Sequence, residues 1–163
     1  MKAQALRDRM DKMLEPSLVA LVSLMVLNVL WQVFTRFVLK NPSSYTEELA
    51  RYLLIWVGLL GASYVVGKKM HLAIDVLTMK LKGRRKHMSD LFIQLCVFLF
   101  SLAVAFVGGI NLVTLTLELQ QISAALEIKL GYVYMSIPLS GFIMMLYSGS
   151  YCLESIGRLR EKA

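Results

Sequence analysis

Four long apolar runs without a charged residue constrain this chain more than any other feature of its sequence. A transmembrane helix needs roughly 20 apolar residues to cross about 30 Å of hydrocarbon. Three of the runs reach that length, and the second does so once Arg51, with its long side chain, and the two residues before it are added. The runs cover residues 16–35, 52–67, 91–117 and 130–153.

The distribution of apolar residues indicates the fold class. Hydrophobic residues make up 57% of the 163 positions and lie in blocks, whereas a soluble domain interleaves them with charges. We therefore predict an all-α integral membrane protein that forms a single membrane domain over residues 1–163. Its four transmembrane helices are expected at about 16–36, 46–67, 91–117 and 130–153.

The positive charges predict the topology. Of the 18 lysines and arginines, 14 lie in the N-terminal segment, the 68–90 segment and the C-terminal tail. The other four, Arg36, Lys40, Arg51 and Lys129, fall on the opposite side. Because cytoplasmic segments are enriched in lysine and arginine, we expect both termini in the cytoplasm. The net charge of +7 therefore reflects membrane topology rather than binding of nucleic acid.

Two further segments, 1–15 and 70–83, are too short to span a membrane. The first carries apolar residues at helical spacing, and both a short surface helix and a solvated tail are open alternatives for it. The second is predicted to be an amphipathic helix on the cytoplasmic interface, ended by Gly83 and followed by a basic run that suits anionic headgroups. His71 and Asp75 share one stripe of this helix. With no third ligand in view, we predict no metal site there.

Charges cluster where the second span begins. Ser44 and Glu47 have the spacing of a capping box, which predicts that the helix starts there. Glu47 and Glu48 then lie in its first turn, within reach of Arg51 at four and three residues. One interpretation is that the three charges satisfy one another. The other is that the extra carboxylate pairs with a further cation, on this chain or on another.

Further along the second span, small residues predict close helix packing. Such residues let another helix approach, and lipid supplies no hydrophobic drive to bring helices together. Trp56 lies in mid-span, where an indole N–H usually finds an acceptor on protein. Both features indicate that protein surrounds this helix. The small residues are Gly58, Gly61, Ala62, Ser63 and Gly67.

The last two spans carry their own packing signals. Ser101, Ala105 and Gly109 recur every four residues and predict a second close-packing ridge. Pro138 predicts a local bend near the outer end of the last span. Between these spans, residues 118–129 are expected to form either an outer interfacial segment or an ordered loop.

The sequence lacks the signatures of an enzyme or of an autonomous carrier. No ionisable residue interrupts the four runs, and the motifs of serine–lysine hydrolases, HExxH metalloproteases and phosphate-binding loops are missing. We therefore expect no catalytic residue and no metal on this chain. The chemistry of transport would reside on another subunit.

The stretch from Glu47 to Asp75 resembles the small membrane subunit of TRAP transporters, the tripartite ATP-independent periplasmic transporters, in the DctQ-like family. The matching pattern is E-E-L-A-R-Y-x-x-x-W at 47–56, G-A-S at 61–63 and K-K-M-H-L-x-I-D at 68–75. Chain length, the four spans and the predicted topology extend the resemblance over nearly the whole sequence.

This resemblance implies a three-part system in the bacterial inner membrane. A periplasmic binding protein would deliver a carboxylate-bearing solute, such as a sialic acid or a C4-dicarboxylate. A large multi-span subunit, driven by a sodium gradient, would carry the solute inward by an elevator motion. The small subunit would need no cofactor and bind no substrate. It would widen the scaffold around the elevator and offer part of the docking surface for the binding protein.

The resemblance also implies roles for individual residues. His71 and Asp75 would hold the interfacial helix to the base of the second span. The contacts expected with the large subunit are Glu47, Glu48, Arg51, Trp56, Gly58, Gly61 and Ala62. The docking residues expected on the outer segments are Arg36, Lys40, Glu118, Glu127 and Lys129.

Two other classes of membrane protein fit the same residues. A self-contained channel or exporter could assemble from identical copies through the small-residue faces, and it would move solute when reconstituted alone. A membrane anchor could hold a cytoplasmic partner through the basic 68–90 segment. Such an anchor would tolerate changes at Glu47 and Arg51.

Overall fold

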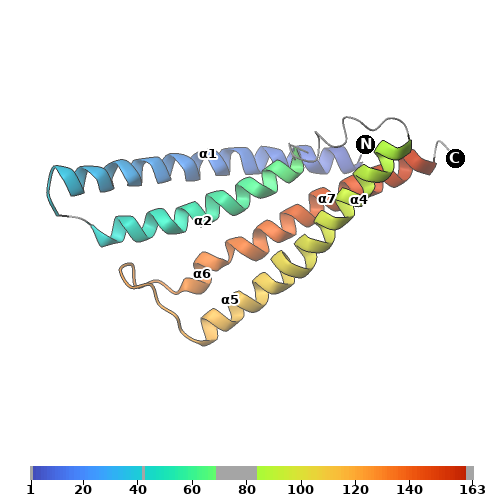
Figure 1. Ribbon diagram of the computed structural model, residues 1–163. Helices are drawn as coiled ribbons and strands as arrows, with labels where there is room; N and C mark the ends of the chain where they lie inside the picture. Colours follow the sequence, from blue (N-terminus) through green and yellow to red (C-terminus); the bar gives the residue numbers. More distant parts are fainter. Residues whose placement is uncertain (1, 42, 69–83, 161–163) are drawn as a thin grey trace.

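The computed structural model describes residues 2–41, 43–68 and 84–160 and is almost entirely helical over them. Four rods are long and apolar enough to cross a membrane, which confirms the predicted all-α membrane fold (Figure 1). The interfacial helix predicted at 70–83, with His71 and Asp75, lies outside the described residues. The elements are α1 (Lys2–Phe37), α2 (Ser44–Gly67), α4 (Arg84–Phe100), the π-helix η1 (Ser101–Gly108), α5 (Gly109–Glu118), α6 (Leu130–Tyr134) and α7 (Ser136–Arg160).

Helix α1 is longer than the span predicted within it. Its 36 residues extend over about 54 Å, whereas the hydrocarbon is roughly 30 Å thick. The segment before the apolar run is therefore helical, which agrees with the surface helix and not with the solvated tail. It continues into the span without a break. Leu14 is buried in this segment, and Met10 packs against the same core cluster.

Helix α2 does not start with the predicted capping box. Its N-cap is Ser43, and the Ser43 side chain makes no capping hydrogen bond. The Thr46 hydroxyl instead donates to the Ser43 carbonyl at 2.9 Å, and Nδ2 of Asn28 on α1 donates to the Thr46 carbonyl at 2.8 Å. The start of α2 is thus fixed by its neighbour α1 rather than by a cap of its own.

The third span consists of α4, η1 and α5 in one continuous rod that packs along α7. A Cβ added to Gly109 would lie 2.9 Å from the Pro138 ring, and one added to Gly141 would lie 2.7 Å from Ala105. The predicted close-packing ridge is therefore confirmed. The wide π-turns of Ser101–Gly108 contact α7 along this ridge, and no sequence signal predicts them.

The last span breaks where Pro138 predicts a bend. Helix α6 ends at Tyr134 and α7 begins at Ser136. Proline lacks an N–H, and its ring crowds the carbonyl four residues earlier, which here belongs to Tyr134. The connection 119–129 before this span is an ordered loop, one of the two alternatives, closed by a hydrogen bond of 3.0 Å from Leu130 to Gln121.

The helices form two antiparallel pairs that meet along α2 and α7. One pair is α1 with α2, and the other is the α4–η1–α5 rod with α6 and α7. Both termini lie at one end of the bundle, here named the terminal end, and the connections 38–43 and 119–129 lie at the other, named the loop end (Figure 1). The pairs converge toward the terminal end and diverge toward the loop end. That both termini share one end agrees with the predicted topology, while the side of the membrane stays a prediction.

Candidate functional site

One face of α2 is turned away from the other helices that the structure describes. Its residues recur every three or four positions, which places them on a single stripe of the helix. Leu54 is 60% exposed in the middle of this stripe, and the residues on the opposite side of α2, among them Leu53 and Leu60, are buried. We name this stripe the open face of α2, and it comprises Glu47, Arg51, Leu54, Gly58, Gly61, Ala62 and Val65.

The glycines of the open face differ from the glycines that pack within the chain. A Cβ added to Gly58 or Gly61 would meet nothing within 4 Å, whereas one added to Gly67 would lie 2.6 Å from the Tyr147 ring. The predicted small-residue patch is therefore divided between two faces. Ser63, on the buried side, donates to the Ser140 carbonyl at 3.1 Å. The described residues leave open space beside Gly58 and Gly61, and Ala62 next to them is exposed.

Trp56 lies at the border between the two helix pairs. Its ring is half-buried and packs against the core cluster. It lines an apolar hollow of about 370 Å³ together with Leu21 of α1, Leu53 of α2 and Val133 of α6. The hollow lies in the gap that opens between the pairs toward the loop end. Packing inside the chain thus covers part of the predicted contact surface of Trp56.

The charges at the start of α2 separate into two groups. Arg51 Nη2 lies 3.7 Å from Glu47 Oε1, and both side chains are about two-thirds exposed, at 68% and 66%. Glu48 points the other way, toward the connection before α6. Its Oε2 accepts hydrogen bonds from the backbone N–H groups of Ala125 at 2.8 Å and Leu126 at 2.9 Å. Glu48 thus ties α2 to the opposite helix pair, and Glu47 is the acid that pairs with Arg51.

The five predicted docking residues all lie at the loop end, and all five are exposed. Lys40 and Glu127 have positive φ angles of 50° and 54°, which mark tight turns of the two connections.

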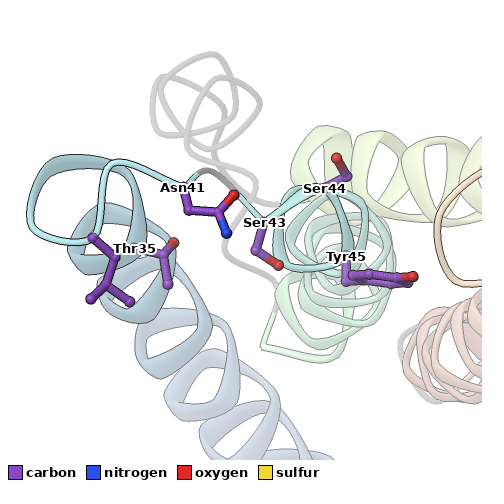
Figure 2. Close-up of a pocket in the computed structure, with 6 residues that line it drawn as sticks. Thr35, Asn41, Ser43, Ser44 and Tyr45 are labelled. Atoms are coloured by element: carbon purple, nitrogen blue, oxygen red, sulfur yellow. The ribbon is translucent and has the colours of Figure 1, made fainter.

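A hollow of about 590 Å³ lies between the end of α1 and the start of α2. Figure 2 shows Thr35 on its α1 side, Ser43 and Tyr45 on its α2 side and Asn41 between them.

A polar cluster at the terminal end is absent from the sequence-based predictions. Asp11 of α1 accepts hydrogen bonds from the Tyr147 hydroxyl at 2.5 Å and from Lys68 Nζ at 2.7 Å. Lys68 Nζ also lies 3.3 Å from Glu15, which accepts a hydrogen bond from the Tyr64 hydroxyl at 2.8 Å. Hydrogen bonding to Asp11 is the main cause that raises the pKa of Lys68, which therefore stays protonated.

A second set of contacts extends this cluster toward the chain termini. Arg7 pairs with Glu154 at 2.8 Å, and its guanidinium lies 4.3 Å from the centre of the Tyr151 ring. The Tyr151 hydroxyl donates to the Gly67 carbonyl at the end of α2. We name the two sets together the terminal clamp, because they join α1, α2 and α7. Spacings of four, between Asp11 and Glu15 and between Tyr147 and Tyr151, are the sequence signal that could have indicated it.

Comparisons with known proteins agree with this architecture. The family model described as "Tripartite ATP-independent periplasmic transporters, DctQ component" matches residues 25–158. The chain is 38% identical over 73 residues to the sialic acid TRAP transporter permease protein SiaT of Haemophilus influenzae strain 86-028NP. The aligned residues make up 42% of this chain and 12% of that protein. It is 27% identical over 108 residues to the sialic acid TRAP transporter small permease protein SiaQ of Vibrio cholerae, covering 66% of this chain and 62% of that protein.

A third relative is the isethionate TRAP transporter permease protein DctMQ of Oleidesulfovibrio alaskensis. It is 26% identical over 100 residues, which cover 61% of this chain and 16% of that protein. The chain thus spans less than two thirds of the length of each of these three relatives. The family model matches most of the chain, including the open face of α2 and three of the four apolar rods in full. The chain therefore belongs to the DctQ family of tripartite ATP-independent periplasmic transporter components and is a multi-pass membrane protein.

Proposed function

We propose that this chain is a small permease subunit that joins a large multi-span permease subunit in a TRAP transporter. In this proposal, the large subunit uses a sodium gradient to import a carboxylate-bearing solute. The small subunit widens the fixed scaffold around it, without binding solute or catalysing a reaction. Two relatives are named for sialic acid, so a sialic acid is the first solute to test. The charge distribution supports an orientation with both termini in the cytoplasm of the bacterial inner membrane.

The open face of α2 is the observation that carries this proposal. It presents Gly58 and Gly61 with free space above them, next to an exposed pair of opposite charges, Glu47 and Arg51. Small residues are the usual contact surface where transmembrane helices approach closely. A partner that covers this charged pair must supply further hydrogen bonds, because only then is the cost of removing the two charges from water repaid. In the proposal, Arg51 is the charged residue of the open face that contacts the large subunit.

Bulky side chains on the open face test the proposed contact. In the double variant Gly58→Leu/Gly61→Leu we expect co-purification with the tagged large subunit to fall about tenfold or more, because the helices can no longer approach. The matched control is Gly108→Leu, since Gly108 is also an exposed glycine but lies in η1, on the other helix pair. Equal co-purification of the double variant, the control and the unmodified chain would refute the proposed interface.

The same variants distinguish the large subunit from a second copy of this chain. Two differently tagged copies of the chain are co-expressed without the large subunit, and one tag is used for purification. Under the proposal the second tag is lost, because the open face binds a different protein. Recovery of both tags, abolished by Gly58→Leu/Gly61→Leu, would instead support the homo-oligomeric channel.

The loop end is the proposed docking surface for the periplasmic binding protein. Five exposed charged residues lie on its two connections and at the adjoining ends of α1 and α5, and charges of this kind steer association in a salt-dependent way. Reversing Lys40 and Lys129 to glutamate is expected to lower uptake and to change its dependence on ionic strength. Uptake by the unmodified and the charge-reversed chains that is equal at every salt concentration would exclude this docking surface.

A further inference from the structure

An apolar groove at the terminal end, on the far side of α7 from α2, has no role in the proposed assembly. It has a volume of about 540 Å³ and lies between the first turns of α1 and the packed helices α4 and α7. The hydroxyl of Ser150, which lines the groove, donates to the Tyr147 carbonyl at 2.7 Å and is therefore satisfied within the chain. The lining residues are Leu6, Phe98, Met145, Leu146, Gly149, Ser150 and Leu153.

The terminal clamp locates this groove relative to the membrane surface. Lys68 is the first charge after the apolar run of α2, and it contacts Asp11 of α1, which contacts Tyr147 of α7. These groups therefore mark one level, where hydrocarbon gives way to headgroups. Along the helices, Met145 and Leu146 lie on the loop-end side of Tyr147, whereas Leu6 and Leu153 lie beyond Asp11 and Tyr147 toward the termini. The groove thus crosses the boundary between acyl chains and headgroups.

Arg9 supplies a positive charge near the headgroup end of the groove. Arg9 is exposed on α1 three residues after Leu6, a spacing that puts both on one side of the helix, and no ion pair to it is found among the described residues. The acid beside Leu153 is Glu154, whose charge is offset by Arg7 at 2.8 Å.

We propose that this groove binds an anionic phospholipid, with one acyl chain along Met145 and Gly149 and the phosphate beside Arg9. The occupant is a lipid because the groove is apolar on its hydrocarbon side and opens at headgroup depth. It is an anionic lipid because Arg9, an exposed cation for which the described residues supply no ion pair, attracts a negative headgroup. Gly149 forms the floor, where the absence of a side chain leaves Phe98 accessible to the acyl chain. This site depends on membrane insertion alone and not on the proposed transport partner.

Native mass spectrometry of the purified full chain tests this site. Dioleoyl phosphatidylglycerol and dioleoyl phosphatidylethanolamine, which have the same acyl chains, are added in equal amounts. We expect preferential retention of phosphatidylglycerol, and Arg9→Gln should lower that retention about fivefold, since one cation near the headgroups contributes that much. Arg36→Gln, an exposed arginine at the loop end, should leave it unchanged.

Variants that fill the groove test the contribution of its apolar lining separately from that of the charge on Arg9. Gly149→Leu should remove most of both lipids, whereas Gly58→Leu, on the open face of α2, should retain them. A Cβ at residue 149 would lie 3.5 Å from Phe98, which is an ordinary contact, so the variant is expected to fold. Leu6→Trp blocks the mouth from α1 and provides a second test. Equal retention of the two lipids by the unmodified chain, or normal retention by both groove variants, would overturn the proposal.

Discussion

The two ends of the bundle hold the helix pairs together in different ways. At the terminal end, α1, α2 and α7 are joined by a continuous set of ion pairs and hydroxyl bonds around Asp11 and Lys68. At the loop end the pairs diverge (Figure 1). Among the described residues, few polar side chains connect the two pairs there: Glu48 accepts hydrogen bonds from the backbone of Ala125 and Leu126, and the side chains of Glu48 and Tyr52 each contact Ser123. The terminal end is thus a clamp of many contacts, and the loop end is held mainly through Glu48.

Polar contacts in this membrane subunit concentrate at the end where charged groups can stay partly hydrated. Charges at headgroup depth keep part of their hydration, so ion pairs such as that of Asp11 with Lys68 form there at a smaller desolvation cost than in hydrocarbon. The gap at the loop end is lined by apolar residues, including Leu21 and Val133, which lipid tails can cover. We infer that the clamp fixes the orientation of the two pairs, while their spacing at the loop end can adapt to a partner.

Removal of Asp11 is expected to have the largest effect on stability. Asp11→Ala leaves the hydroxyl of Tyr147, a residue that is 0% exposed, without its acceptor and leaves Lys68 without its nearest anion. A loss of about 2–4 kcal/mol is expected, since a buried donor without a partner and a broken ion pair both contribute. Thermal unfolding in detergent measures this loss in the free energy of unfolding. The control is Asp8→Ala, an exposed acid on the same helix. Equal unfolding of the two variants would show that the clamp does not hold the bundle.

Glycine substitutions compare the packed interior with the open face. Gly141→Ala should lower the free energy of unfolding by about 1–3 kcal/mol, because its Cβ would lie 2.7 Å from the backbone nitrogen of Phe106. Gly58→Ala should raise it by up to about 1 kcal/mol, since alanine favours the helix and free space surrounds the position. The same unfolding assay measures both. Changes of the same sign would contradict the division of the glycines between two kinds of surface.

Local rules of the sequence predicted most of the fold. Charge-free length predicted the four spans, the chemistry of Pro138 predicted the break before α7, and a spacing of four predicted the ridge through Gly109. The terminal clamp could not be predicted in this way. Asp11 is 57 residues from Lys68 and 136 residues from Tyr147 along the chain. Contacts of this kind depend on how the helices assemble, which helical periodicity alone does not specify.

The candidate site was predicted less completely than the fold. The sequence offered two acids as partners of Arg51, and only the position of the loop at Ala125, which is 77 residues from Glu48, decides between them. It also grouped Ser63 with Gly58 in one small-residue patch. Because α2 packs on α7 through Ser63, the assembled structure puts these two residues on different faces.

The smallest expected effect concerns the carboxylate at the loop end. In Glu48→Ala the backbone N–H group of Ala125 loses its acceptor, whereas that of Leu126 keeps a longer hydrogen bond of 3.3 Å to the Ser123 hydroxyl. We expect amide hydrogen exchange at Ala125 to become about tenfold faster, and that at Leu126 to change less, because a bond from an amide to a charged oxygen is stronger than one to water. Global unfolding should change little, since the clamp at the other end remains intact.

Glu47→Ala is the matched control for this measurement. It removes an acid one residue away, but its pair with Arg51 is exposed on the other side of α2, and such surface pairs contribute little. Exchange at Ala125 and Leu126 should therefore stay at the rate of the unmodified chain. If Glu48→Ala also unfolds the bundle globally, the loop end is held as firmly as the terminal end. If instead neither variant changes exchange, Glu48 is not the residue that ties α2 to the opposite helix pair.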